Sequence, residues 1–248
     1  MLRRSSLPVL FRSFLAIWLL VWGGSAWAVK ELPAPSPFRV FAVDTRTENL
    51  RLSWKNVAGD SLGSFARWNQ DLAATGVQLL FAMNAGMFQS GPEHTPMGLL
   101  VIDGKQVHLI NRRMGPKTNF YQQPNGVFLL AGDGPHIVRT QDYPGALKHV
   151  HLATQSGPLL VVNGAVNPAL NRSANAVVRN GVGVRGHQVY FVITEQPVTF
   201  REFAEYFLAT LHCTDALYLD GNISGAMIAN RAPINATSGF GPMIGVVR

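Results

Sequence analysis

The sequence predicts an α+β fold: a single domain with a mixed, mainly antiparallel sheet and a few packing helices. Short apolar runs bounded by turn residues recur along the chain, which is typical of strands. Glycine and proline are frequent, with 24 and 15 among 248 residues, and they favour tight turns. Two segments place apolar residues at helical spacing. We find no repeat and no composition break after Pro37 that would indicate a second domain.

Residues 1–28 are predicted to be a signal peptide rather than part of the fold. Basic residues near the start precede an apolar run at 14–22, and Ala26-Trp27-Ala28 has the small–x–small pattern of a signal-peptidase site. The apolar run is short for a membrane span. We therefore expect cleavage after Ala28, a periplasmic or secreted protein, and no stable membrane insertion afterwards. An uncleaved membrane anchor is the alternative, and the mass of the mature N-terminal peptide distinguishes the two.

The charge of the chain is mild once the signal is removed. The formal net charge is +7; without Arg3, Arg4 and Arg12, 18 basic and 14 acidic residues remain, a net charge of +4. This charge suits an anionic small molecule or polymer, but no basic run interleaved with aromatics indicates nucleic acid. Cys213 is the single cysteine, which excludes an internal disulfide and a cysteine-based metal site. We interpret it as a small buried apolar residue.

The first half of the chain is predicted to be mostly extended. Residues 29–37 form a proline-rich lead-in, and the folded domain is expected over 38–248. Phe65, Trp68 and Leu72 share one helical face, which predicts a short helix ending near Gly76. The strands expected here are 38–43 and 50–54, paired as a hairpin, then 77–83.

The second half contains hairpin signals and the clearest helix. Asp103-Gly104 and Asn163-Gly164 each lie between apolar runs, which indicates tight hairpin turns. Thr199 and Glu202 have the spacing of a capping box, and the apolar stripe that follows, to Leu211, predicts a core-packed helix. The strands expected here are 98–102, 106–110, 124–130, 157–166 as a hairpin, 181–184, 189–193, 216–220 and 242–247.

Several predicted strands end in polar or small residues, which raises the prospect of one shared cleft. The strand at 216–219 ends at Asp220, and Glu195 follows another apolar run; end-of-strand carboxylates suit acid–base or nucleophilic chemistry. Arg179 offers a planar fork for a phosphate or carboxylate. Asn84 also ends a strand. The main-chain N–H groups near Gly86, Gly157 and Gly221 suit an anion-accepting concavity. Singly, each of these polar residues is more often a turn or cap residue, and it is their recurrence at strand ends that favours a shared site.

Other catalytic schemes lack their motifs. The sequence around Ser156 has no Gly-x-Ser-x-Gly elbow, and no phosphate loop ends in Gly-Lys-Ser/Thr. Gly181 and Gly183 lack the third glycine and the helix of a dinucleotide site. His149 and His151 would share one face of a strand, but no further metal ligands are evident. We therefore expect neither a metal nor a cofactor.

Six short motifs, in this order and spacing, resemble a known family, the phosphodiester glycosidase domain. This is the domain of the lysosomal uncovering enzyme, which removes N-acetylglucosamine from a sugar phosphodiester, and of a bacterial subgroup of exported, periplasmic proteins. The resemblance covers about 38–248. Its motifs are Asn84-Ala85-Gly86-Met87-Phe88, Pro96-Met97-Gly98-Leu99, Asn119-Phe120-Tyr121 with Pro124-Asn125-Gly126, Gln155-Ser156-Gly157-Pro158, Arg179-Asn180-Gly181 and Leu219-Asp220-Gly221.

The resemblance implies an exported hydrolase that cleaves a sugar-1-phosphodiester, a small molecule or a glycan, in cell-envelope or glycan metabolism. A phosphate monoester leaves readily because its second pKa is near 6, so the usual demand for two carboxylates relaxes. On this basis Asp220 is the expected base or nucleophile, Glu195 a second acid or base and Arg179 the phosphate clamp. The expected substrate-binding residues are Asn84, Gly86, Asn125, Ser156, Gly157, Gly221 and Ser224.

Two other functions stay open on the sequence. The glycosidase branch usually continues after the aspartate with two glycines and a serine pair, whereas here Gly221 is followed by Asn222-Ile223-Ser224-Gly225. This difference favours the first alternative, a non-catalytic binding module for envelope glycans or glycophosphates. The second is a phosphodiesterase that cleaves the P–O bond. The sugar, the aglycone and the oligomeric state are not predicted.

Overall fold

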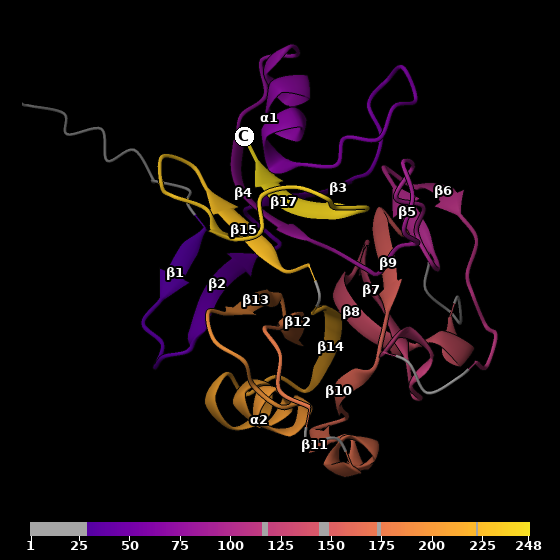
Figure 1. Cartoon of the computed structure of the whole chain (residues 1–248), viewed down its shortest axis with the longest axis vertical. Coiled ribbons are helices and arrows are strands. Elements are labelled where there is room, and N and C mark those ends of the chain that lie inside the picture. The colour runs from indigo at the N-terminus through magenta and orange to yellow at the C-terminus, as the bar shows by residue number, and fades with distance from the viewer. Residues whose placement is uncertain (1–28, 116–118, 144–148, 173–174, 222) are drawn as a thin grey trace, which may run out of the picture.

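The computed structural model describes residues 29–115, 119–143, 149–172, 175–221 and 223–248 (Figure 1). The predicted signal peptide and Asn222 lie outside the described residues. The α+β class with mainly antiparallel strands is confirmed, and every strand pair among the described residues is antiparallel. The strands divide among three sheets, where the sequence led us to expect one.

The largest sheet has seven strands and contains Asp220. In spatial order they are β1 (Lys30–Leu32), β2 (Phe38–Asp44), β13 (Gln188–Thr194), β12 (Asn180–Arg185), β14 (Asp215–Asp220), β10 (Leu159–Val162) and β11 (Ala165–Val166). The second sheet has five: β16 (Ile234–Asn235), β15 (Gly225–Ile228), β4 (Leu79–Asn84), β17 (Met243–Val247) and β3 (Asn49–Ser53). The third also has five: β6 (Lys105–His108), β5 (Leu100–Ile102), β9 (Leu152–Ser156), β7 (Gly126–Ala131) and β8 (Gly134–Arg139).

The helices are short and lie on outer faces of the sheets. The predicted helices are confirmed as α1 (Phe65–Ala73) against the second sheet and α2 (Phe200–Glu205) against the first (Figure 1). Thr199 and Glu202 form the predicted capping box. A π-helical turn, η4 (Tyr206–Thr210), extends α2, and three 3-10 turns complete the helical content of the described residues: η1 (Asn119–Tyr121), η2 (Thr140–Asp142) and η3 (Pro168–Arg172).

The predicted hairpin between 38–43 and 50–54 is wrong. Both segments are strands, but β2 pairs with β1 and β13, whereas β3 pairs with β17 in another sheet. The chain turns at Asp44, whose carbonyl accepts from the N–H groups of Thr47 and Glu48, and the two strands then diverge. Their hydrogen-bonding edges are taken by residues about 150 and 190 positions further along the chain, so local alternation alone could not reveal the pairing.

The two short hairpin turns are confirmed. Asp103 and Gly104 join β5 to β6 with φ of 48° and 76°, and Asn163 and Gly164 join β10 to β11 with φ of 49° and 74°. Both central residues of each turn lie in the left-handed region that such hairpins require. Lys30–Leu32, within the lead-in, forms an edge strand that was not expected from the sequence. Strands β8, β9, β15 and β16 are also absent from the strands expected from the sequence.

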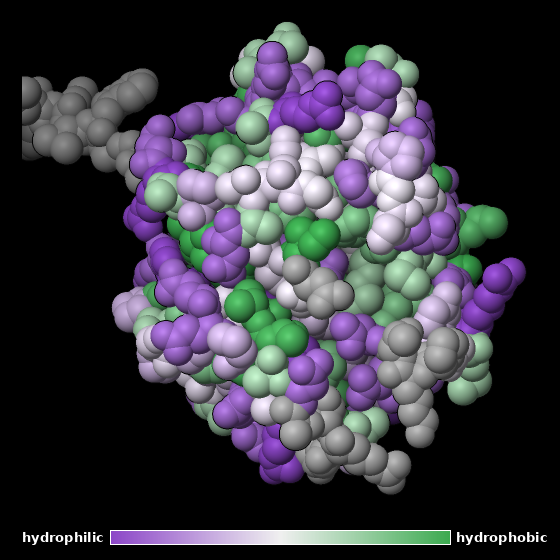
Figure 2. Space-filling view, in the orientation of Figure 1, coloured by the Kyte–Doolittle hydropathy of each residue, from purple (hydrophilic) through white to green (hydrophobic). Residues whose placement is uncertain are grey.

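The core lies between the sheets, with a second cluster under α2. Side chains of all three sheets meet in the larger cluster, including Phe41, Phe81 and Phe128. Polar and apolar residues are interspersed over the face seen in Figure 2. Among the described residues, no helix is both long and apolar enough to span a membrane.

Candidate active site

Asp220 stands at a bulge near the end of β14. Asn180 of β12 pairs with Asp220, and the next residue, Gly181, pairs with Tyr218, so Leu219 is an extra residue on β14. A bulge of this kind bends a strand and redirects the side chain beside it. Asp220 is half-buried there, at the rim of the largest sheet.

Hydrogen bonds hold the main chain on both sides of this bulge. The Ser156 hydroxyl donates to the Leu219 carbonyl at 2.7 Å, and the Ser224 hydroxyl donates to the Asp220 carbonyl at 3.1 Å. The N–H of Gly221 donates to Asp220 Oδ1 at 2.6 Å, which orients the carboxylate. Two of the predicted binding residues, Ser156 and Ser224, therefore position the backbone around Asp220.

A pair of buried asparagines joins Asp220 to the second sheet. Asn180 Oδ1 accepts from the Asp220 N–H at 2.8 Å, and Asn180 Nδ2 donates at 2.9 Å to both the side-chain and main-chain oxygens of Asn84. Asn84 Oδ1 also accepts from Gly225 N–H at 2.9 Å. The Nδ2 group of Asn84 is buried with no partner among the described residues. Buried donors without a partner are uncommon in folded proteins, so this amide group is a notable feature of the candidate site.

The hydroxyl of Tyr218 lies directly beneath Gly221. A β-carbon added at Gly221 would lie 1.8 Å from the Tyr218 oxygen, so only glycine fits. This hydroxyl is buried and has no hydrogen-bond partner of good geometry within the described chain. Burial raises the pKa of Tyr218 above its usual range, and the nearby Arg179 partly opposes that rise. Tyr218 therefore stays protonated and can donate.

Arg179 is almost completely buried, with 1% of its surface exposed. Its Nε donates to the carbonyl of Val198 at 2.8 Å and its Nη2 to that of Asn175 at 2.7 Å. The guanidinium carbon lies 3.6 Å from the ring centroid of Phe200. No carboxylate of the described residues forms an ion pair with it. Burial lowers its pKa, with the neighbouring Tyr218 opposing the shift.

Glu195 lies apart from Asp220. It follows β13, which is separated from β14 by β12, so the two acids are two strand spacings apart, roughly 10 Å. Its side chain is 46% exposed and accepts from Arg39 Nη1 at 2.9 Å. Arg39 also pairs with Glu31, which pairs with Arg231, so Glu195 belongs to a surface ion-pair network.

The predicted glycines serve close contacts between chain segments. A β-carbon at Gly86 would lie 2.3 Å from the Gln155 carbonyl, and one at Gly157 would lie 2.5 Å from the β-carbon of Asn125. The Gly86 N–H donates to the Thr154 hydroxyl at 3.1 Å, so it is already engaged. Asn125 donates to the Phe120 carbonyl at 3.0 Å, while its Oδ1 is buried without a partner among the described residues.

Two residues of this site, Asn180 and Tyr218, were not predicted from the sequence. Asn180 was quoted only as part of a motif, although an amide that opens a glycine-rich strand was a usable signal. Tyr218 lies inside the continuous apolar run of residues 216–219, so it was interpreted as part of an ordinary buried strand. Within the described ranges, no three His, Cys, Asp or Glu side chains come together as metal ligands.

The fold and site define a class: a three-sheet α+β domain with a strand-end aspartate held by amides and backed by a buried arginine. Sequence comparison narrows it further. The sequence model described as "Phosphodiester glycosidase" matches residues 78–247. The chain therefore belongs to the phosphodiester glycosidase family, as its motifs predicted.

One sequence relative and two solved structures are also similar to this chain. The chain is 34% identical over 216 residues to "Uncharacterized protein YigE" of Escherichia coli K12, covering 86% of this chain and 83% of the relative. One similar solved structure is the zebrafish N-acetylglucosamine-1-phosphodiester alpha-N-acetylglucosaminidase catalytic domain, auto-inhibited by its pro-peptide. It aligns with a TM-score of 0.60 at 13% identity, and the alignment covers 84% of this chain and 76% of the zebrafish chain. A hypothetical protein from Synechocystis aligns with a TM-score of 0.52 at 13% identity, and the alignment covers 88% of this chain and 61% of the Synechocystis chain. At these identities the structural likenesses show a shared fold.

Proposed function

We propose that this protein is an exported hydrolase that cleaves glycosyl phosphodiesters at the anomeric C–O bond. The observation that carries the proposal is the buried Arg179, which no carboxylate of the described residues pairs, next to the aspartate-bearing end of the sheet. A buried cation without a counter-ion is costly, and a bound anion offsets that cost. Family membership supports a glycosidase reaction, and the net charge after signal removal supports an anionic substrate.

In this proposal Asp220 attacks the anomeric carbon or activates the water that does so. The Gly221 N–H fixes the orientation of its carboxylate. The departing phosphate monoester needs little protonation, because its second pKa is near 6. A second carboxylic acid is therefore unnecessary, which is consistent with the position of Glu195 in a surface ion pair. We assign Glu195 no step.

Arg179 acts through its charge in this mechanism. Its Nε and Nη2 already donate to main-chain carbonyls, so a direct two-pronged clamp on phosphate would require those bonds to open. We assign it the stabilisation of the phosphate charge from behind Tyr218, whose unpartnered hydroxyl donates to the phosphate. The unpartnered Nδ2 of Asn84 donates to a sugar hydroxyl. Both donors are fixed before substrate arrives, which favours catalysis.

The test uses purified mature protein and a panel of glycosyl phosphodiesters, starting with UDP-GlcNAc. We expect release of free sugar, abolished in Asp220→Asn. Asp215→Asn is the matched control: it lies at the other end of β14, and its side-chain oxygen can still accept from Asn163 N–H. We expect that variant to keep full activity. Turnover by Asp220→Asn at the native rate would refute the assignment.

Running the reaction in ¹⁸O-water identifies the bond that breaks. Label in the sugar supports C–O cleavage, and label in the phosphate means that the protein is a P–O phosphodiesterase. Saturable glycan binding without turnover across the panel, unchanged in Asp220→Asn, would instead identify a binding module. Export is tested separately: residues 1–28 have the pattern of a signal, so the mature protein from the periplasm should begin at Val29.

A further inference from the structure

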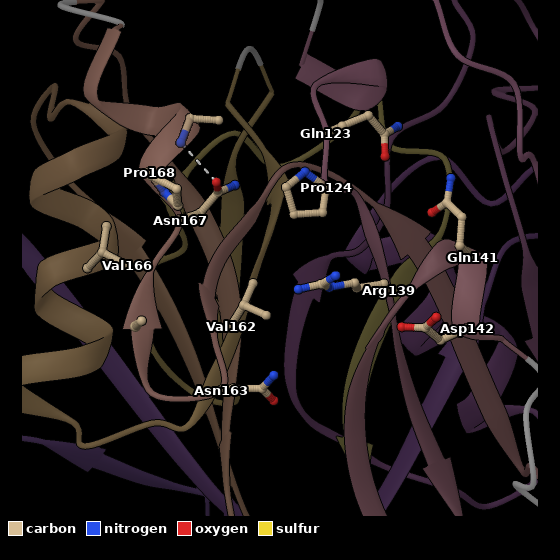
Figure 3. Close-up of a pocket in the computed structure, with 12 residues that line it drawn as sticks. Gln123, Pro124, Arg139, Gln141, Asp142, Val162, Asn163, Val166, Asn167 and Pro168 are labelled. Atoms are coloured by element: carbon tan, nitrogen blue, oxygen red, sulfur yellow. Dashed lines mark hydrogen bonds between the residues drawn. The ribbon is translucent and has the colours of Figure 1, made fainter.

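A pocket of about 630 Å³ lies between the first and third sheets, and Asp220 is not among its lining residues (Figure 3). One wall comes from β10, β11 and η3, and the other from the end of β8, η2 and the segment before β7. Asn163, on the first wall, binds Asp215 at the start of β14 through its N–H. Asp220 is five residues along the same strand, so that end of the pocket is about 16 Å from it.

Arg139 supplies a cation to this pocket. It is the final residue of β8, and Figure 3 shows its guanidinium reaching from that wall toward β10. No hydrogen bond or ion pair within the described chain engages this guanidinium, although the carboxylate of Asp142 lines the same wall. A guanidinium offers five donors in a planar fork that matches a phosphate or a carboxylate.

The rest of the lining suits a sugar. The amides of Gln123, Gln141 and Asn163 offer both donors and acceptors, and the carboxylate of Asp142 accepts from hydroxyl groups. The side chain of Val162 and neighbouring apolar groups form a surface on which ring carbons can pack. The volume lies within the range of pockets that bind small molecules. Cation, amides and apolar wall together match a polyhydroxylated ring that carries one anionic group.

We propose that this pocket is a second binding site, for an anionic sugar whose phosphate or carboxylate pairs with Arg139. The site is independent of hydrolysis at Asp220. It binds a charged residue of a glycan, and its existence does not require that the same molecule reach the aspartate. Asp142 disfavours bare polyanions by repulsion and favours ligands that present hydroxyl groups beside their charge.

Calorimetric titration of the mature protein with glucose 6-phosphate, methyl glucuronide and glucose tests the proposal. Neither charged probe is a phosphodiester, so neither is a substrate of the proposed reaction. We expect at least one charged probe to bind at least tenfold more tightly than glucose. Comparing the phosphate with the carboxylate identifies the preferred anion. Arg139→Ala should weaken that binding about tenfold or more, since a charge-assisted hydrogen bond is lost.

Three further variants locate the ligand. Ala165→Trp, an exposed lining residue enlarged to fill the pocket, should also abolish binding. Arg67→Ala removes an exposed arginine of α1, on a different sheet, and should leave binding unchanged, as should Asp220→Asn. Failure of both charged probes to bind the native protein would overturn the proposal. Binding that is lost in Asp220→Asn but retained in Arg139→Ala and Ala165→Trp would overturn it too.

Discussion

The side-chain amide of Asn180 donates at 2.9 Å to both the main-chain and the side-chain oxygen of Asn84. These hydrogen bonds join β12 of the first sheet to β4 of the second sheet. The two asparagines are 96 residues apart in sequence and belong to different sheets. The other end of the Asn180 amide accepts from the N–H of Asp220. One buried side chain therefore holds the main chain at Asp220 against Asn84 of the second sheet.

Asn180→Ala should destabilise the protein by about 2–4 kcal/mol, because it leaves buried groups of Asn84 and Asp220 without partners. Activity on glycosyl phosphodiesters should fall with it. Urea unfolding gives the free energy of unfolding. The control is Asn69→Ala on α1, where an exposed side chain accepts one long bond of 3.3 Å from Leu79 N–H. Its cost should stay below about 1 kcal/mol. Equal costs for the two variants would contradict the role of Asn180.

Gly221→Ala should be strongly destabilising, because the new methyl group would lie 1.8 Å from the Tyr218 hydroxyl oxygen. Removing that oxygen in Tyr218→Phe relieves the nearest contact, so the double variant should recover part of the lost stability. We expect a coupling energy of roughly 1–3 kcal/mol in a double-mutant cycle. Strictly additive effects would mean that the two groups do not oppose each other. In our mechanism the double variant still lacks activity, because it has lost the hydroxyl donor.

Arg179→Met should lower turnover strongly while changing the free energy of unfolding little. Methionine removes a buried charge that no carboxylate of the described residues pairs, while keeping apolar volume against Phe200. The carbonyl of Val198 retains a second donor, the N–H of Val177. We therefore expect the free energy of unfolding to change by less than about 1 kcal/mol or to rise. Turnover should fall at least about 100-fold, as when an electrostatic donor is lost. A large loss of stability with native turnover would contradict this prediction.

Cys213 should be inert in the native protein. Burial raises the pKa of its thiol to about 12, from an ordinary value of 9.0. The folded state therefore disfavours the thiolate. Below pH 9 the thiol is protonated in both the folded and the unfolded state, so it does not make stability depend on pH. As the pH rises from 9 toward 12, only the unfolded thiol ionises, and the free energy of unfolding falls progressively. A disulfide reagent at pH 8 should leave Cys213 unmodified until urea is added. Rapid modification of the folded protein would show that the thiol is accessible, and Cys213→Ala should flatten the stability profile above pH 9.

Local features of the fold could be predicted from the sequence because their causes lie within a few residues. The Asp-Gly and Asn-Gly turns adopt the backbone that those residues favour, and the Thr199–Glu202 cap needs only adjacent groups. Pairing between strands far apart in the sequence could not be predicted, since β2 and β3 have similar alternation yet find partners in different sheets. Those partners are chosen by three-dimensional packing, which the pattern of one strand does not encode.

The site was predictable only in part, for the same reason. The strand-end position of Asp220 followed from a local run of apolar residues. The environments of Glu195 and Arg179 depend on distant residues: the partner of Glu195 is 156 positions away, and Arg179 is enclosed by the helix that follows β13. Whether a charged side chain faces water or a ring therefore became visible only in three dimensions.

The placement of β17 has a consequence for when the site can form. This strand, from the far end of the sequence, lies between β4 and β3, and its first residue, Met243, pairs with Asn84. Until β17 is synthesised and inserted, β4 has no hydrogen-bonded strand on that side, and Asn84 has no residue paired with it there. We therefore expect that a chain lacking β17 does not assemble the candidate site, and that the hydrolysis we propose requires this strand to be in place.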